Sequence, residues 1–154
     1  MSPTADRPLR RSERAFLAEQ RVGRLATIDP RGRPHVVPVC FALSDDRVFI
    51  SLDEKPKTVE AHRLQRVRNL KLSPDVALVV DDYSEDWLRL GYVMVRGTAR
   101  LVEVDDSGHD EAIRHLREKY PQYESMAIDR LPLIQINLIG AISWSWSGER
   151  FPVD

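Results

Sequence analysis

A pair of lysines that follows a short apolar segment has the clearest chemical meaning in this chain. Lys55 and Lys57 lie two positions apart, shortly after Ile50-Ser51-Leu52. The chain carries nineteen arginines but only four lysines, so two lysines at the end of one predicted strand stand out. Ammonium groups act as point charges toward phosphate, and the basic stretch 62–68 adds guanidinium groups, with Arg66 as a third, weaker contributor. The pattern indicates a phosphate anchor, although the same residues also suit a solvated charged turn.

The remaining composition is that of an ordinary globular domain. The chain has 154 residues, of which 42% are hydrophobic and 31% charged, with a net charge of −1. This composition suits one domain and provides no global positive field for nucleic acid or an anionic membrane. No apolar run reaches the roughly 18 residues of a membrane helix, and the N-terminus lacks the apolar core of a signal peptide. We expect a cytoplasmic protein with a flexible segment over 1–11 and a single domain over 12–154.

Metal and nucleophilic chemistry find little support in the sequence. The four histidines are His35, His62, His109 and His115, and they lack the spacing of known metal-binding motifs. The single cysteine, Cys40, lies in an apolar segment without a neighbouring base, which favours a buried structural thiol. We therefore predict no metal site and name no catalytic residue.

The first third of the chain predicts one helix and a three-stranded meander. The expected elements are a helix over 12–20 and strands over 22–28, 35–43 and 47–52. Asp29-Pro30-Arg31-Gly32 is a strong hairpin turn between the first two strands, and Ser44-Asp45-Asp46 turns the chain again. Pro38 within the second strand indicates a bulge or an edge position, because proline cannot donate to the ladder.

The rest of the chain alternates helical and strand patterns. The expected elements are a helix over 58–71, a buried strand over 76–80, a long strand over 90–104, a helix over 107–120, and a final strand or strand pair over 131–146. Gly97 indicates a bend or bulge in the long strand. Together these elements predict a mainly β fold, a six- or seven-stranded antiparallel β-barrel with helical caps.

Three tryptophans are candidates for either a ligand site or a subunit contact. Trp144 and Trp146 lie two positions apart and therefore share one strand face, and Trp87 begins another apolar segment. Tryptophan is favoured both in pockets that bind rings and in dimer cores, so the two alternatives remain open.

The order of several motifs resembles the split β-barrel flavin and deazaflavin oxidoreductases, the relatives of pyridoxamine 5′-phosphate oxidase. The motifs lie at residues 23–27, 32–39, 48–52, 53–57, 64–70, 81–87 and 95–101. They are similar to an actinobacterial branch of probable coenzyme F420-dependent enzymes, and the resemblance covers residues 12 to about 105. The chain lacks the additional arginine, serine and histidine residues that bind phosphate and substrate in true pyridoxamine phosphate oxidases, which argues against vitamin B6 oxidation.

This resemblance implies a homodimer with two equivalent cofactor sites in the cleft between subunits. The residues it places at the cofactor ring are Ile50, Ser51, Leu52, Val37, Pro38 and Val39, and those it places at the phosphate are Lys55 and Lys57. We add Arg66 to the phosphate site and Trp87 to the ring site as candidates from the residue pattern.

Three functional classes follow from these observations. The first is an oxidoreductase that uses coenzyme F420 for hydride transfer to a small-molecule acceptor, and the second is an FMN-dependent oxidoreductase on the same barrel. The third is a protein that binds or carries such a cofactor without turnover. A deazaflavin carries the reactive hydride itself, which is consistent with the scarcity of catalytic side chains.

Overall fold

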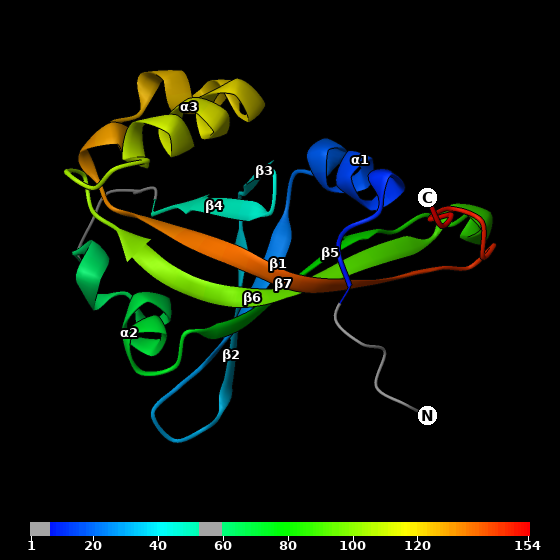
Figure 1. The fold of residues 1–154 in the computed structure, drawn as a ribbon, viewed down its shortest axis with the longest axis horizontal. Coiled ribbons are helices and arrows are strands. Elements are labelled where there is room, and N and C mark those ends of the chain that lie inside the picture. Colours follow the sequence, from blue (N-terminus) through cyan, green and yellow to red (C-terminus); the bar gives the residue numbers. More distant parts are fainter. Residues whose placement is uncertain (1–6, 53–59) are drawn as a thin grey trace.

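Seven antiparallel strands form the body of the molecule (Figure 1). A computed structural model describes residues 7–52 and 60–154 of the chain. The strands occur in the sheet in the order β2-β1-β5-β6-β7-β4-β3. They are β1 (Gly23–Ile28), β2 (Pro34–Val39), β3 (Ala42–Ser44), β4 (Arg47–Ser51), β5 (Asp75–Asp82), β6 (Gly91–Val102) and β7 (Leu133–Ser145). The predicted mainly β fold of six or seven antiparallel strands is confirmed, with seven strands in the sheet.

Within residues 7–52 and 60–154, three α-helices and four short 3-10 helices cover the strands. The α-helices are α1 (Arg11–Glu19), α2 (Gln65–Leu72) and α3 (His109–Lys119), and the 3-10 helices are η1 (Ala61–Arg63), η2 (Trp87–Arg89), η3 (Pro121–Ser125) and η4 (Ile128–Arg130). Helices α1 and α3 lie on the side that carries β3 and β4, whereas α2 packs on the opposite side against β1 and β6 (Figure 1). No helix in the described part of the chain is long and apolar enough to cross a membrane.

The hairpin between β1 and β2 forms as the sequence predicts. The backbone N–H of Asp29 donates to Arg33 O and that of Gly32 donates to Asp29 O, both at 2.9 Å. Gly32 has a φ of 76°, a value that glycine adopts without steric cost. β2 is an edge strand whose register with β1 is unbroken, so Pro38 occupies an edge position rather than a bulge.

The second predicted strand, over 35–43, is in fact two strands at opposite edges of the sheet. The chain bends at Cys40 and Phe41. As a result, β2 forms one edge of the sheet and β3 forms the opposite edge. The three-stranded meander expected over 22–52 is therefore two separate strand pairs. The Tyr120 hydroxyl holds the bend: it accepts from Phe41 N and lies 3.0 Å from the carbonyl oxygens of Phe41 and Arg21. Burial raises the pKa of Tyr120 to about 12, so this donor stays protonated.

In the rest of the chain one prediction is corrected, and one alternative that the sequence left open is decided. The helix expected over 58–71 is shorter, because Leu64 has an extended ψ of 138° and separates η1 from α2. Residues 58 and 59 lie outside the described residues. The final segment is one long strand, β7, and not a pair.

The irregularity expected at Gly97 is confirmed. The pairing of β6 with β7 shifts register between Arg96 and Gly97, which leaves Ile139 as the extra residue on β7. A Cβ at position 97 would lie 2.3 Å from Asn137 O, closer than any side chain tolerates. The two strands can therefore approach this closely only with glycine at that position.

The sheet has one face in the core and one outer face. Alternate residues of the central strands point into the barrel, where Leu25, Leu78, Val80, Val93 and Val95 are at most 1% exposed. Val67 and Leu70 of α2 belong to the same cluster, so α2 closes one end of the barrel. A second cluster lies beneath α3 and includes Phe49 and Leu116.

A buried carboxylate, that of Glu13, holds the N-terminal segment against the domain from Arg7 onward. Glu13 of α1 is fully buried, and its carboxylate accepts from the Arg7 guanidinium at 2.5 and 2.9 Å, from Arg10 N at 2.8 Å and from Ser143 Oγ at 2.6 Å. Leu9 is buried as well. Residues 7–10, which we assigned to the flexible segment, thus contact the domain closely.

Replacing Glu13 by glutamine should destabilise the protein by about 2–3 kcal/mol, because charge-assisted hydrogen bonds are lost and the Arg7 guanidinium remains. Burial raises the pKa of Glu13, but the hydrogen bonds from Arg7, Ser143 and Arg10 N outweigh this and leave the pKa below its usual range. The unfolded chain therefore binds more protons than the folded one as the pH falls below the usual glutamate value. Glu13 stabilises the fold above that value, and this stabilisation is lost as the pH falls through the lowered pKa.

Urea unfolding at pH 7 and near pH 3 measures both effects. Glu13→Gln should be less stable than wild type at pH 7, and the difference should shrink at the lower pH. The exposed control Glu149→Gln should match wild type at both. An unchanged stability of Glu13→Gln at pH 7 would contradict this role.

Candidate functional site

A cavity of about 190 Å³ lies where β2 and β4 end. These two strands come from the opposite halves of the sheet, and the first turn of α2 lies beside their ends. The lining residues are Val22, Pro38, Val39, Cys40, Ser51 and Arg66. Four of them, Pro38, Val39, Ser51 and Arg66, are residues that the sequence assigned to the cofactor site.

Ser51 is a buried polar residue at the wall of this cavity. Along β4, Val48 and Ile50 point into the barrel, so Ser51 lies on the other face of the strand. It is 4% exposed, and its Oγ is buried without a hydrogen-bond partner among the described residues. A buried hydroxyl without a partner costs roughly 1–3 kcal/mol, so such groups in folded proteins usually meet a ligand or water. The cavity thus offers an unused donor and acceptor.

Arg66 and Cys40 complete the polar part of the wall. Arg66 lies in the first turn of α2 and is half-buried, so its guanidinium gives this cavity positive charge. Cys40 is half-exposed and not buried as we predicted, because it follows the end of β2 at the bend. Pro38 and Cys40 lie two positions apart, and this spacing is the signal in the sequence that could have placed Cys40 at the site.

The remaining candidates are placed elsewhere or lie outside the described residues. The side chains of Ile50 and Leu52 are buried in the barrel core, and Val37 packs against that core as well. Lys55 and Lys57 lie within 53–59, outside the described residues, three and five positions after Leu52 in the chain. Their assignment to the phosphate remains a prediction.

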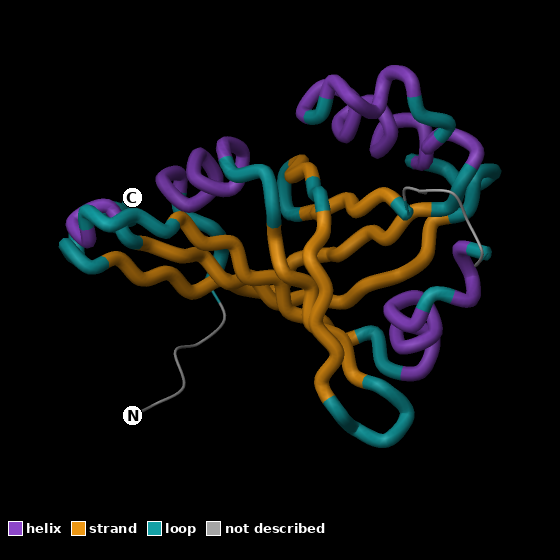
Figure 2. The backbone as a smooth tube through the Cα atoms, turned by 180° about the vertical axis from the view of Figure 1, so that it is seen from behind, coloured by secondary structure: helices purple, strands orange, loops and turns teal. Residues whose placement is uncertain are grey.

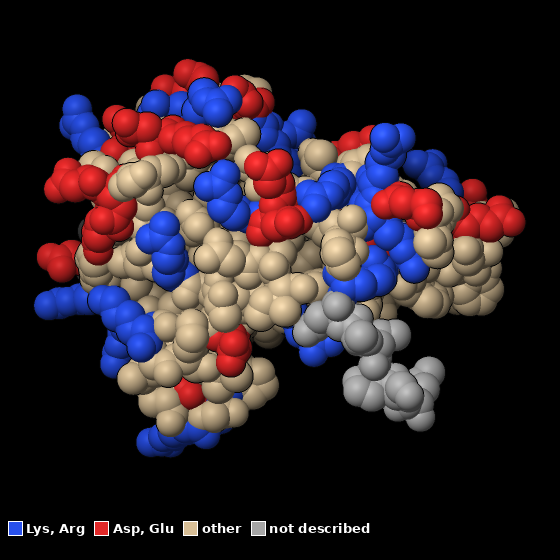
Figure 3. Space-filling model, in the orientation of Figure 1, with Lys and Arg blue, Asp and Glu red and all other residues tan. Residues whose placement is uncertain are grey.

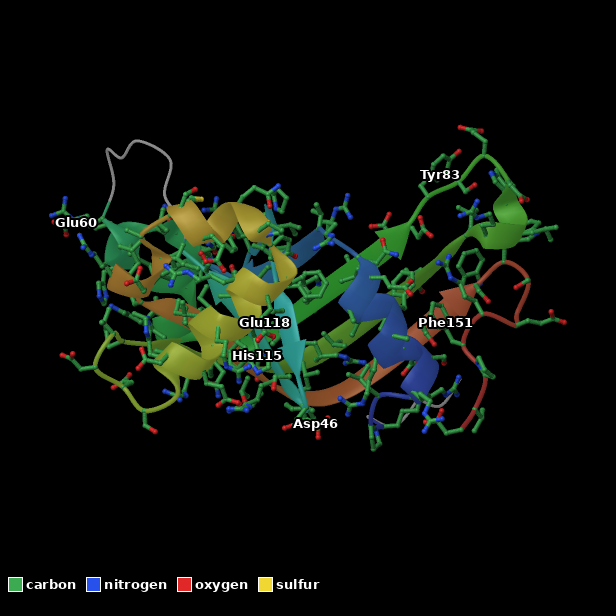
Figure 4. The ribbon with its side chains drawn as sticks, turned by 90° about the horizontal axis from the view of Figure 1, so that it is seen from above. Asp46, Glu60, Tyr83, His115, Glu118 and Phe151 are labelled. Carbon is green, nitrogen blue, oxygen red and sulfur yellow. The ribbon has the colours of Figure 1, made fainter. Side chains whose placement is uncertain are left out.

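Trp87 lies far from this cavity in its own chain. It belongs to η2, at the tip of the β5–β6 extension, where its ring contacts Trp146 edge to face with centroids 5.2 Å apart. Figure 4 shows Tyr83 at this tip and Glu60, close to α2, at the opposite end of the molecule. One chain therefore does not bring Trp87 together with Ser51 and Arg66.

The outer face of the sheet carries an apolar patch flanked by charged residues, because Arg24, Arg96 and Asp81 each lie in one of its rows. Directly paired positions on this face include Val79, Met94 and Ile142 in one row and Val36, Ala26 and Ala77 in the next. Tyr92 stacks on Trp144 in a third row, with centroids 6.0 Å apart. Val36 is 58% exposed and Trp144 45% exposed. Pro38 also lies on this outer face, in the row of Val79, so the cavity borders this face.

Comparison with known proteins finds a related sequence and solved structures with the same fold. A 5a,11a-dehydrotetracycline/5a,11a-dehydrooxytetracycline reductase of Streptomyces rimosus is 34% identical over 96 residues, which cover 62% of this chain and 65% of that reductase, slightly less than two thirds of its length. A conserved hypothetical protein from Mycobacterium tuberculosis superposes with a TM-score of 0.73 at 21% identity, over 97% of this chain and 92% of that one. An F420 reductase superposes with a TM-score of 0.64 at 22% identity, over 87% of this chain and 98% of that one.

The sequence profile of pyridoxamine 5′-phosphate oxidase matches residues 9–143, from just before α1 almost to the end of β7. The match includes every strand of the sheet and all the residues that line the cavity. Since the profile spans most of the sequence and the solved structures share the fold, the chain belongs to the pyridoxamine 5′-phosphate oxidase family, with its flavin-binding split β-barrel.

Proposed function

We propose that this protein is an oxidoreductase that binds coenzyme F420 at the cavity between β2 and β4 and transfers a hydride to a small-molecule acceptor. The observation that carries the proposal is Ser51 Oγ, a buried hydroxyl without a partner among the described residues, at the wall of a cavity also lined by Arg66. The family and the Streptomyces reductase support a flavin or deazaflavin oxidoreductase. The F420 reductase with the same fold favours the deazaflavin over FMN.

The residues at the cavity suit the parts of such a cofactor. Pro38 and Val39 offer an apolar wall to a flat ring, and Ser51 Oγ can hydrogen-bond to a polar ring edge. Arg66 favours negative charge, and Lys55 and Lys57 are proposed to neutralise the phosphate. When bound, the cofactor supplies the hydride, and the protein positions the ring and excludes water.

A second copy of the chain is proposed to complete the site. The cavity measures about 190 Å³, whereas pockets for ligands of this kind are usually roughly 300–1,000 Å³. Pro38 belongs both to the cavity wall and to the outer face, so a copy docked on that face would lie beside the ring. Trp87 and Trp146, which are about half-exposed, are proposed to contact this second copy.

Fluorescence titration with coenzyme F420 and with FMN tests the proposal. Protein purified from a host that makes no deazaflavin should be colourless and should bind F420 saturably, one molecule per chain, and more tightly than FMN. Reduced F420 should then be consumed with an acceptor such as 5a,11a-dehydrooxytetracycline. A protein that purifies yellow with bound FMN, or that binds neither cofactor, would contradict the assignment.

Replacing Ser51 by alanine should affect stability and binding in opposite directions. Without cofactor, the variant should be as stable as wild type or up to about 1 kcal/mol more stable, because an unsatisfied buried hydroxyl is removed. Its affinity for coenzyme F420 should fall by about fivefold, since one neutral hydrogen bond is lost. Thermal unfolding and fluorescence titration measure the two effects.

The matched control is Ser125→Ala, at an exposed position in η3. It should leave cofactor affinity unchanged. If Ser51→Ala destabilised the free protein while binding F420 as wild type does, Ser51 would be a structural residue and the site assignment would be wrong.

A further inference from the structure

A second, basic pocket lies between the β1–β2 hairpin and α2. It is an open pocket of about 570 Å³. Figure 2 shows the hairpin loop projecting beyond the sheet with α2 beside its strands, and Figure 3 shows basic side chains at the end of this hairpin and over α2. The lining residues are Asp29, Pro30, Arg31, Arg33, Pro34, His35, Gln65 and Arg68.

Both carboxylate oxygens of Asp29, the acidic residue of this pocket, accept hydrogen bonds from within the turn. Asp29 Oδ1 accepts from the backbone N–H groups of Arg31 and Arg33, and Asp29 Oδ2 accepts from Arg33 Nε at 2.8 Å. These contacts, the backbone N–H of Arg33 first, hold the pKa of Asp29 below its usual range. The carboxylate is therefore charged and already engaged, and it cannot also neutralise Arg31 or Arg68.

Among the described residues, two guanidinium groups of this pocket have no counter-charge. Neither Arg31 nor Arg68 has an ion-pair partner among residues 7–52 and 60–154. Three arginines against one aspartate give the pocket a net charge of +2. His35 adds a ring nitrogen, Nδ1, that is buried and lacks a hydrogen-bond partner within the described part of the chain.

The walls of the pocket are held in place by a polar network. Asn69 Nδ2 donates to Thr27 Oγ1 at 2.9 Å, and Gln65 Nε2 donates to Asn69 Oδ1 at 2.7 Å. Asn69 and Thr27 are fully buried, so α2 is fixed against β1 opposite His35. The fold therefore fixes the backbone of Arg68 relative to β1, while the side chains of Arg31 and Arg68 are exposed and can reach into the pocket.

The pocket and the Ser51 cavity share two elements, β2 and α2. β2 contributes Pro38 and Val39 to the cavity and Pro34 and His35 to the pocket. Pro34 and Pro38 lie four positions apart along the strand, a length of about 13 Å. A ligand seated in the cavity can thus reach the pocket along β2 if it carries an extended acidic end.

We propose that this pocket is a second anion subsite, which takes a carboxylate or phosphate group through Arg31 and Arg68. The planar guanidinium forks suit both anions. The anion can be the acidic end of the cofactor, which rests on the proposed function, or a carboxylate of the acceptor, which does not. The subsite itself depends only on the charges of Arg31 and Arg68 and on the shape of the pocket.

Calorimetric titration with inorganic pyrophosphate at low ionic strength tests the subsite. Wild type and the variant Lys55→Ala/Lys57→Ala should both bind pyrophosphate saturably at this pocket. The variant Arg31→Ala/Arg68→Ala, built on the lysine double variant, should bind at least about tenfold more weakly. The control Arg11→Ala/Arg130→Ala, on the same background, removes two exposed arginines elsewhere and should bind normally.

Three results would overturn the subsite: no saturable binding to wild type, complete loss of binding in the lysine double variant, or equal losses in the pocket variant and its control. Repeating the titration on the lysine double variant with saturating coenzyme F420 identifies the source of the anion, because the proposed phosphate site at Lys55 and Lys57 is then absent. Displacement of pyrophosphate by F420 supports the subsite as the place of the cofactor's acidic end. Binding of pyrophosphate beside F420 supports it as a place for an acceptor carboxylate.

Discussion

Replacing both Lys55 and Lys57 by alanine should weaken the binding of coenzyme F420 by about ten- to a hundredfold. A charged hydrogen bond to phosphate contributes roughly 1.5–3 kcal/mol, so each single variant should lose about tenfold or more. The double variant should lose more than either single one but less than their product, because both charges share one phosphate. The loss should grow as ionic strength falls, since salt screens exposed charges. Fluorescence titration of the four proteins measures these effects.

The matched control is Lys71→Ala, which removes an exposed lysine from the last turn of α2. It should bind the cofactor as wild type does, and all variants should retain the thermal stability of wild type. If the folded double variant bound F420 and FMN normally, the two lysines would form only a solvated turn.

Placing a charge on the apolar patch of the outer face should separate the proposed homodimer into monomers. Met94 lies in the row with Val79 and Ile142, and Met94→Arg would bury an unpaired guanidinium between two copies. Burying an unpaired charge costs several kcal/mol, and at roughly 4 kcal/mol the dissociation constant would rise about a thousandfold. An obligate dimer of this size should bury roughly 2,000 Å² or more in total, enough to be sensitive to such a change.

Sedimentation equilibrium at micromolar concentration measures the oligomeric state. Wild type should sediment as a dimer and Met94→Arg as a folded monomer with reduced affinity for F420, because the second copy completes the site. Leu72→Arg, which adds the same charge at an exposed residue of α2, should remain dimeric. A monomeric wild type would contradict both the dimer and the shared site.

Local patterns in the sequence predicted the elements that depend on near neighbours. The Asp29–Gly32 turn gave the β1–β2 hairpin, because its hydrogen bonds lie within five residues. Pro38 indicated a bulge or an edge position, of which the structure shows the edge, and the irregular pairing expected at Gly97 is confirmed. Each of these features follows from what proline or glycine does to its own backbone.

Features that depend on distant residues could not be predicted in the same way. The break between β2 and β3 lies at Cys40 and Phe41, which both suit a continuous strand, and it is held by Tyr120 from another part of the chain. Leu64 likewise suits a helix, yet its backbone is extended between η1 and α2. Periodicity alone cannot show such tertiary constraints.

The sequence predicted only part of the candidate site, because the rest depends on contacts between distant residues. The resemblance indicated a segment around Ser51, but only the alternation along β4 shows that Ser51 lies at the cavity while Ile50 lies in the core. The basic pocket was not predicted at all. Arg68 lies more than thirty residues from Arg31 and Arg33, and the fold alone brings these residues together.

Alkylation of Cys40 tests most directly whether the cavity is the cofactor site. Cys40 is the only cysteine of the chain and lines the cavity beside Ser51, so its modification by iodoacetamide can be followed by intact mass. Coenzyme F420 should slow the reaction in proportion to its occupancy, as measured by fluorescence titration of the same sample. F420 that binds saturably while Cys40 reacts at its unliganded rate would contradict the account and place the cofactor elsewhere.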